Sequence, residues 1–126
     1  YNDYCNTLKD LVIDGYFFFL GDDDILIDNT ALQRIVNNLK ADGLICQMKR
    51  GVNKLKPTHK QIELKLIESG SIGMPCLVLN SKYKNLIDIP ATSNGDFVWI
   101  KEISKLTNLN FIKEVLVYSN QRNYGK

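Results

Sequence analysis

A short apolar run, residues Tyr16–Leu20, leads directly into Gly21 and three consecutive aspartates. The run is too short for a buried helix, and its aromatic residues favour a β-strand. Because no charged residue interrupts it, we expect a central strand that is covered on both faces. Adjacent carboxylates repel one another, so they favour a bound cation. The segment therefore predicts a central strand whose carboxyl end carries an acidic, cation-binding turn, at the edge where open α/β sheets bind ligands.

Helical and strand patterns alternate along the chain. Apolar residues at helical spacing predict helices at Tyr4–Val12, at Ala31–Leu39 and from Gly95 to Leu106. Further strands are expected at Leu44–Met48, Met74–Leu79 and Phe111–Tyr118. Residues Ile62–Ile67 fit either state, with a helix favoured. The expected fold class is α/β, with a mixed, mostly parallel sheet flanked by helices.

Length and composition limit what such a fold can do. The chain of 126 residues is long enough for one domain with a real core. Its net charge of +2 gives no reason to expect a nucleic-acid partner. No apolar run approaches the roughly 20 residues of a membrane helix. The scattered Cys5, Cys46 and Cys76 are typical of reduced cytosolic thiols rather than disulfides or zinc ligands.

A basic segment lies between Lys49 and Lys60, with five basic residues and no acid. Gly51 and Pro57 interrupt it, so a basic loop is expected. The loop either contacts an anionic ligand or is simply solvated, and solvation is the simpler interpretation. His59 has no second histidine beside it, so we expect no metal role for it. The single tryptophan, Trp99, is expected in the core.

Two segments resemble motifs of inverting GT-A-fold glycosyltransferases, the family-2-like enzymes that use nucleotide-sugar donors. DGYFFFLGDDDIL is similar to their aromatic strand and DxD-type motif, although Gly21 stands where the commonest pattern has Asp. SNGDFVWIKEISKL is similar to the helix start that carries their catalytic base, and GSIGMPCLVLNSKY resembles their acceptor-side segment. The order and spacing agree over nearly the whole chain, which implies a partial GT-A fold.

The resemblance implies a role for individual residues. Asp23 is the closest match to the metal ligand, flanked by Asp22 and Asp24, and the implied metal is Mg²⁺ or Mn²⁺. Through the metal, Asp22 also binds the donor diphosphate. Asp96 is the implied catalytic base, and helix capping is its alternative role. Arg122 follows the last strand and either reaches the phosphates or belongs to a solvated tail. For the aspartates, the alternative is a solvated turn in which Asp24 or Asp28 caps the next helix.

The family's N-terminal strands, which cradle the nucleobase, precede the matched motifs. Residues 1–126 are therefore expected to form a single domain, the C-terminal portion of a catalytic domain, inactive alone. The implied reaction transfers a sugar with inversion to a hydroxyl of a saccharide or lipid-linked saccharide. The implied setting is bacterial surface-polysaccharide synthesis in the cytoplasm, including the inner face of the membrane. Alternatives are an inactive domain or interaction module, and a receiver-like phospho-acceptor domain, which is disfavoured because the strand at Met74–Leu79 ends without an Asp.

Overall fold

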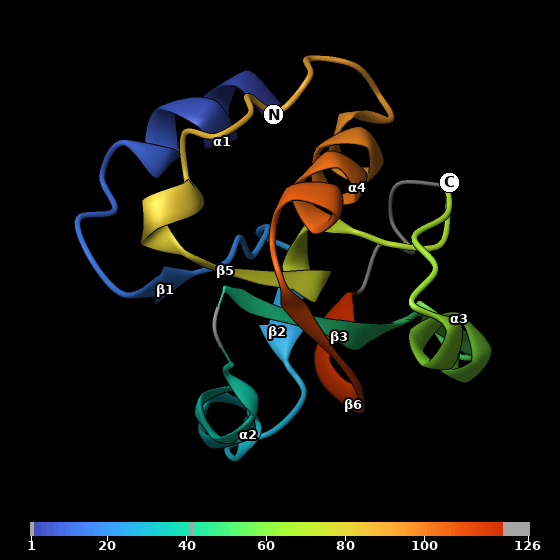
Figure 1. Ribbon diagram of the computed structural model, residues 1–126. Coiled ribbons are helices and arrows are strands. Elements are labelled where there is room, and N and C mark those ends of the chain that lie inside the picture. The colour runs from blue at the N-terminus through green and yellow to red at the C-terminus, as the bar shows by residue number, and fades with distance from the viewer. Residues whose placement is uncertain (1, 41, 120–126) are drawn as a thin grey trace.

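The computed structural model describes residues 2–40 and 42–119. Its elements are, in order, α1 (Asn2–Lys9), β1 (Tyr16–Phe17), β2 (Asp24–Leu26), α2 (Ala31–Asn38), β3 (Gly43–Arg50), β4 (Lys54–Lys56), α3 (His59–Leu64), η1 (Met74–Cys76), β5 (Leu77–Asn80), η2 (Ser81–Tyr83), α4 (Gly95–Leu106) and β6 (Leu109–Ser119). The strands form one sheet in the order β1-β5-β3-β6-β2, and β4 pairs with β3 (Figure 1). The α/β class with a mixed sheet and flanking helices is confirmed.

The sheet is mostly antiparallel, so the predicted mostly parallel sheet is wrong. Within the described residues, β3 and β6 form a parallel pair, whereas the pairs β1–β5, β2–β6, β3–β4 and β3–β5 are antiparallel. Alternating helices and strands suggested parallel crossovers. Instead, β4 returns directly along β3, and β5 enters between β1 and β3 in the opposite direction. Helix–strand alternation alone does not determine strand direction.

Strand β1 lies at an edge of the sheet, which corrects the predicted central strand at residues 16–20. Only Tyr16 and Phe17 pair with β5, opposite Asn80 and Leu79. The following phenylalanines turn inward instead of extending the strand, and the Phe19 ring lies 6.2 Å from that of Trp99. The central strand is β3, in which residues 43–48 are all buried. The predicted burial of residues 16–20 on both faces is also wrong, because Phe17, Phe18 and Phe19 are only partly buried and both ends of the segment are exposed.

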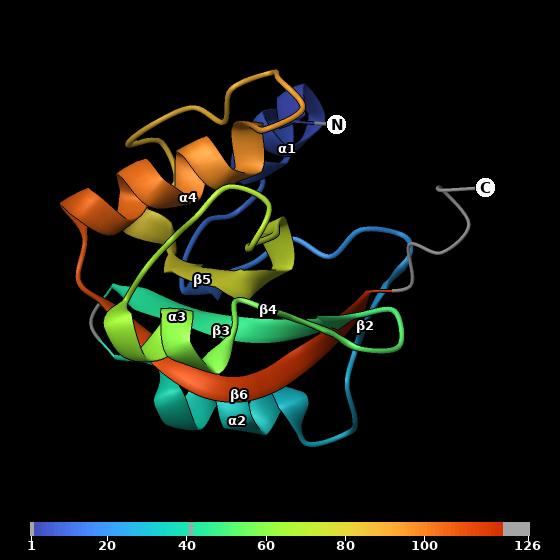
Figure 2. The same cartoon turned by 90° about the vertical axis from the view of Figure 1, so that its right-hand side faces the viewer.

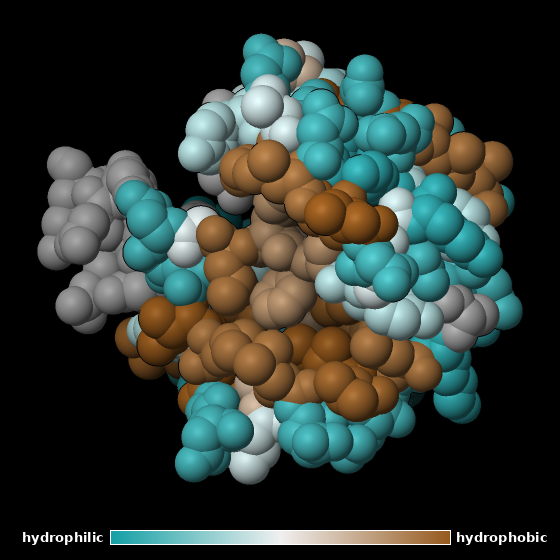
Figure 3. Space-filling view, turned by 90° about the vertical axis from the view of Figure 1, so that its left-hand side faces the viewer, coloured by the Kyte–Doolittle hydropathy of each residue, from teal (hydrophilic) through white to brown (hydrophobic). Residues whose placement is uncertain are grey.

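The side of the molecule that carries β1 is unusually apolar. Figure 3 shows a broad hydrophobic area across this side. Ile13, Tyr16 and Leu20, in and around β1, are all exposed. No other strand within residues 2–40 and 42–119 pairs with the outer edge of β1. Exposed apolar surface beside an edge strand is typical of a contact with further polypeptide.

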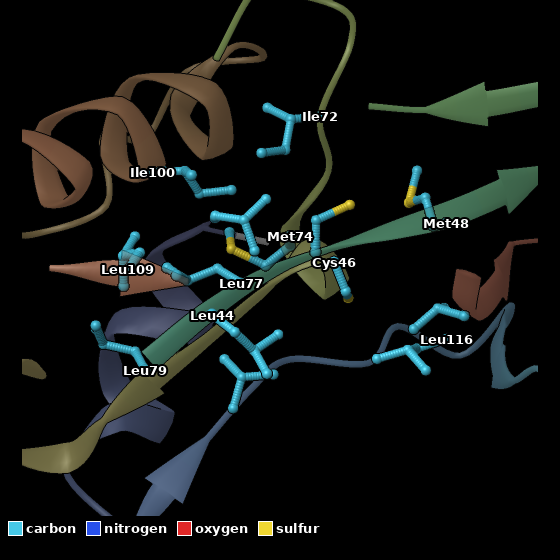
Figure 4. Close-up of a cluster of buried hydrophobic side chains, with 14 of the residues drawn as sticks. Leu44, Cys46, Met48, Ile72, Met74, Leu77, Leu79, Ile100, Leu109 and Leu116 are labelled. Atoms are coloured by element: carbon cyan, nitrogen blue, oxygen red, sulfur yellow. The ribbon is translucent and has the colours of Figure 1, made fainter. Parts of the chain in front are cut away.

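Helices cover both faces of the sheet. Helices α1 and α4 lie on one face and α2 lies on the other (Figures 1 and 2). Between α4 and the sheet, Leu44 and Cys46 of β3 lie close to Leu77, with Ile100 of α4 above them (Figure 4). The apolar spacing at residues 31–39 and 95–106 predicted α2 and α4 correctly, because each helix buries one stripe. Helix α1 ends at Lys9, before the predicted Val12.

Candidate functional site

A pocket of about 730 Å³ opens where the turn after β1 meets the start of α4. The three aspartates at residues 22–24 and Asp96 all line it, although they are distant in sequence. The β3–β4 hairpin, the small-residue loop at residues 70–75 and the loop at residues 91–94 complete its wall. The fold thus brings both sequence-predicted acidic motifs, and the loop of the matched acceptor-side segment, to one cavity.

The three aspartates lie in a tight turn. The amide of Asp24 donates to the Gly21 carbonyl (3.2 Å), and the Gly21 amide donates to Asp24 Oδ2 (2.8 Å). A Cβ at residue 21 would lie only 3.1 Å from that carboxylate oxygen, so glycine leaves room for the reciprocal bond. Asp22 is exposed, while Asp23 and Asp24 are half-buried. Asp24 is also the first residue of β2, a strand that the sequence did not reveal, so it does not cap the next helix.

Two carboxylate oxygens in this turn have no partner among the described residues. Asp23 Oδ2 and Asp24 Oδ1 are buried and form no hydrogen bond within residues 2–40 and 42–119. Buried carboxylate oxygens without partners are costly, and a hard cation would satisfy them. In the part of the chain that the structure describes, no three His, Cys, Asp or Glu side chains are grouped as ligands of one metal ion. Asp23 and Asp24 therefore fit a cation that takes its remaining ligands from a substrate or from water.

Asp96 is the second residue of α4 and is half-buried. The N-cap of this helix is Asn94, so Asp96 is not the N-cap residue. Its Oδ1 accepts the amide of Phe97 at 2.7 Å, one of the first-turn amides that lack a partner within the helix. Its Oδ2 accepts no hydrogen bond from the described residues. The Asp96 side chain lines the pocket. One oxygen thus holds the side chain in place, and the other is available to a ligand.

The loop before α4 is attached to α1 by side-chain bonds. Asn2 Nδ2 donates to the carbonyls of Pro90 (2.8 Å) and Thr92 (3.1 Å). Gly95 is buried against the Pro90 carbonyl and the Asn2 side-chain amide. A Cβ at residue 95 would lie 1.9 Å from the Pro90 oxygen and 2.4 Å from Asn2 Nδ2. Only glycine allows this close approach. The position of Asp96 therefore depends on contacts between α1, this loop and Gly95.

The basic segment forms a hairpin, not the predicted loop. β3 and β4 pair with Met48 opposite Lys56 and Arg50 opposite Lys54. Arg50 and Lys56 line the pocket together with the acidic turn and Asp96. Burial and the positive charges of Arg50 and Lys54 lower the pKa of Lys56, while the negative charge of Asp96 opposes that shift. The pocket lining therefore contains both acidic and basic side chains.

The thiol of Cys76 lies beneath the pocket and is unreactive. It is buried and contacts the Lys56 carbonyl at 3.6 Å. Burial, together with the negative charges of Asp24 and Asp96, raises its pKa to about 12. The thiol is thus protonated at physiological pH and is not a nucleophile.

Other predicted residues lie elsewhere. His59 is exposed at the start of α3, and its Nδ1 accepts from Gln47 Nε2 at 3.0 Å. Trp99 is buried, with its indole donating to the Ile87 carbonyl, which confirms its core position. Arg122 lies outside the described residues. Sequence reasoning did not assign Arg50, Lys56 or Ser119 to the site. The density of basic residues was a signal for the first two, whereas Ser119 carried none.

Comparisons with protein-family models, with curated proteins and with solved structures gave no match. Within the described residues, no helix has the length and apolar character needed to cross a membrane. The site is therefore interpreted from its own geometry and from the motifs quoted above.

Proposed function

We propose that this chain is the C-terminal portion of the catalytic domain of an inverting GT-A-like glycosyltransferase, which transfers a sugar from a nucleotide-sugar donor to a hydroxyl group. One observation carries the proposal: Asp96 and the three aspartates at residues 22–24 line the same pocket. The two motifs were matched to that family separately, and the reaction requires them to face one donor. A cavity of about 730 Å³ is large enough for part of a nucleotide-sugar and an acceptor sugar.

Asp96 is the proposed general base. Its free carboxylate oxygen takes the proton of the acceptor hydroxyl while the hydroxyl oxygen of the acceptor attacks the sugar carbon. The attack comes from the face opposite the diphosphate, which inverts the anomeric centre. The hydrogen bond from the Phe97 amide to Oδ1 keeps the side chain in one orientation, so the other oxygen remains directed to the acceptor.

The acidic turn is the proposed donor-side element. Asp23 and Asp24 present the oxygens without partners, and exposed Asp22 lies next to them. A bound Mg²⁺ or Mn²⁺ supplies charge neutralisation for the departing diphosphate. The Gly21 amide fixes the Asp24 carboxylate, so one side of this ligand set is organised before the donor binds.

The outer edge of β1 is the proposed place of the nucleobase-binding strands. No further strand of the described residues pairs with that edge, and the adjoining side of the molecule carries a broad apolar area. Strands added there would pair with β1 directly before the acidic turn. This arrangement would place a nucleobase next to the donor diphosphate, as the reaction requires.

Two alternatives predict other properties. A receiver-like domain has a parallel, doubly wound sheet, whereas four of the five strand pairs among the described residues are antiparallel. An inactive interaction module would have no need for carboxylate oxygens without partners in a pocket. The proposal also includes the acceptor class, which is a saccharide or lipid-linked saccharide. It further includes a role in surface-polysaccharide synthesis and a cytoplasmic location, including the inner face of the membrane.

The test compares Asp96→Asn with the unchanged sequence in the complete protein, using a panel of nucleotide-sugars. We expect turnover to fall by about a hundredfold or more, the usual scale for losing a general base. Donor binding should change little, because Asp96 is assigned to the acceptor side. Asn still accepts the Phe97 amide, so the free energy of unfolding should change by less than about 1 kcal/mol.

Glu102→Gln is the matched control, because Glu102 lies on the same helix but does not line the pocket. It removes the same charge and should leave turnover near its normal value. Near-normal turnover in Asp96→Asn, with a clear loss of stability, would assign Asp96 a purely structural role and contradict the proposal.

A further inference from the structure

A row of paired residues crosses the sheet beneath the pocket. Ser119 of β6 lies opposite Asp24 of β2 on one side and opposite Arg50 of β3 on the other. Directly paired residues point to the same face of a sheet. All three residues line the pocket, so this face is its floor. The row runs from a carboxylate, through a hydroxyl, to a guanidinium.

The cationic end of this row has no ion-pair partner among the described residues, although the Asp96 carboxylate is near enough to influence Lys56. Among the described residues, neither Arg50 nor Lys56 forms an ion pair, although other basic side chains do. Lys56 is half-buried and repelled by Arg50 and Lys54, which contributes to its lowered pKa. Like charges on a partly buried wall are unfavourable unless an anion binds between them.

The hydroxyl in the middle of the row also lacks a partner. Ser119 is fully buried, and its Oγ has no hydrogen bond in the described part of the chain. A buried hydroxyl without a partner costs free energy, and serine could donate its hydrogen to a ligand oxygen. This second observation is independent of the charges and points to the same ligand chemistry.

We propose that Arg50, Lys56 and Ser119 form a subsite for a phosphate group in this pocket. A guanidinium fork, an ammonium group and a hydroxyl are donors that suit phosphate oxygens. The inference rests on the proposed function, because that reaction supplies two sources of phosphate. These are the diphosphate of the donor and a phosphate carried by the acceptor, such as a lipid-linked sugar phosphate.

The first experiment titrates the chain with inorganic phosphate in the presence of a chelator, followed by backbone amide resonances. We expect saturable shifts in the β3–β4 hairpin and at Ser119. Arg50→Ala and Lys56→Ala should each weaken binding by about tenfold, the scale of one charge-assisted hydrogen bond. Lys49→Ala is the matched control, because Lys49 is exposed, does not line the pocket and belongs to the same strand. It should change binding by less than about twofold.

Ser119→Ala separates binding from folding. Removing a buried hydroxyl without a partner should leave the melting temperature unchanged or raise it, while phosphate binding weakens. Lack of saturable phosphate binding by the unchanged chain would overturn the inference. Equal weakening by Lys49→Ala would also overturn it, because the effect would then come from net charge alone.

Two further ligands distinguish the sources. If pyrophosphate with Mg²⁺ binds more tightly than inorganic phosphate, and Asp23→Asn removes this gain in affinity, the subsite belongs to the donor. Metal-independent binding of glycerol phosphate, unaffected by Asp23→Asn, assigns it to the acceptor. Either result supports the phosphate subsite. If phosphate fails to bind while Asp96→Asn still abolishes turnover, this inference fails alone. If phosphate binds but Asp96→Asn retains turnover, the proposed function fails instead.

Discussion

Gly95→Ala tests the contact that positions Asp96. The new Cβ would lie 1.9 Å from the Pro90 oxygen and 2.4 Å from Asn2 Nδ2. Ordinary contact begins near 3.4 Å, so the Pro90 carbonyl and the start of α4 must separate by about 1.5 Å. The clashing atom is backbone, so a side-chain rotation cannot relieve the strain.

The magnitude follows from opposing effects. Overpacking costs roughly 1–3 kcal/mol, and losing an Asn2 hydrogen bond costs about 1 kcal/mol. Alanine recovers up to about 1 kcal/mol of helix propensity. The strain and the lost bond together outweigh that gain, so we expect the free energy of unfolding to fall by about 2 kcal/mol. For a chain of this length, the melting temperature should fall by about 8 °C.

The assay is thermal unfolding followed by circular dichroism, with Gly73→Ala as the matched control. Gly73 also lines the pocket, but its Cβ would be tight only against the flexible end of Met48, at 3.0 Å, and in ordinary contact with Pro75 Cδ at 3.6 Å. Its backbone has a φ of −131°, which any residue adopts. Gly73→Ala should therefore cost less than about 1 kcal/mol. An unchanged melting temperature for Gly95→Ala would refute the close approach and, with it, the argument for how Asp96 is held.

Two further predictions concern titratable groups. Asp42 accepts hydrogen bonds from the Asn108 amide (2.6 Å) and the Tyr83 hydroxyl (2.7 Å), which lower its pKa from the ordinary 3.8. The Asp42 carboxyl group therefore binds a proton more readily in the unfolded chain, and stability should be lost as the pH falls through and below about 4. Asp42→Asn should reduce this dependence of the melting temperature on acid pH, and an unchanged dependence would contradict the assignment. Cys76, with a pKa of about 12, should resist iodoacetamide at pH 8 in the native chain and react in denaturant, as followed by mass spectrometry; rapid native labelling would contradict its burial.

Sequence patterns predicted the elements that local physics determines. Helices α2 and α4 each bury a stripe at helical spacing, so periodicity alone was sufficient. Both acidic motifs were noted in the sequence, but it is the fold that places the acidic turn and Asp96 at one pocket.

The parts that were missed depend on non-local pairing. β1 has the composition of a buried strand, yet its position at the sheet edge depends on where β5 enters. The Lys-rich β4 has only three residues, too few for their alternation to indicate a strand, and its pairing with β3 makes it one. Ser119 gained its place in the site only because β6 lies between β2 and β3. No single segment contains that information.

The most direct test of the central claim measures Mn²⁺ binding with and without a nucleoside diphosphate. We expect weak Mn²⁺ binding alone, because Asp23 and Asp24 are the two residues that present buried carboxylate oxygens without partners within the described part of the chain. Each nucleoside diphosphate of a panel is added in turn, and at least one should tighten Mn²⁺ binding in the complete protein by supplying phosphate ligands.

Asp23→Asn should weaken this joint binding by about tenfold or more, as measured by electron paramagnetic resonance of free Mn²⁺. Asp10→Asn is the control, since Asp10 is exposed and does not line the pocket. We expect joint binding to be lost in Asp23→Asn and retained in Asp10→Asn. Joint binding that is equal in both variants would contradict the claim that the acidic turn is the donor-side site.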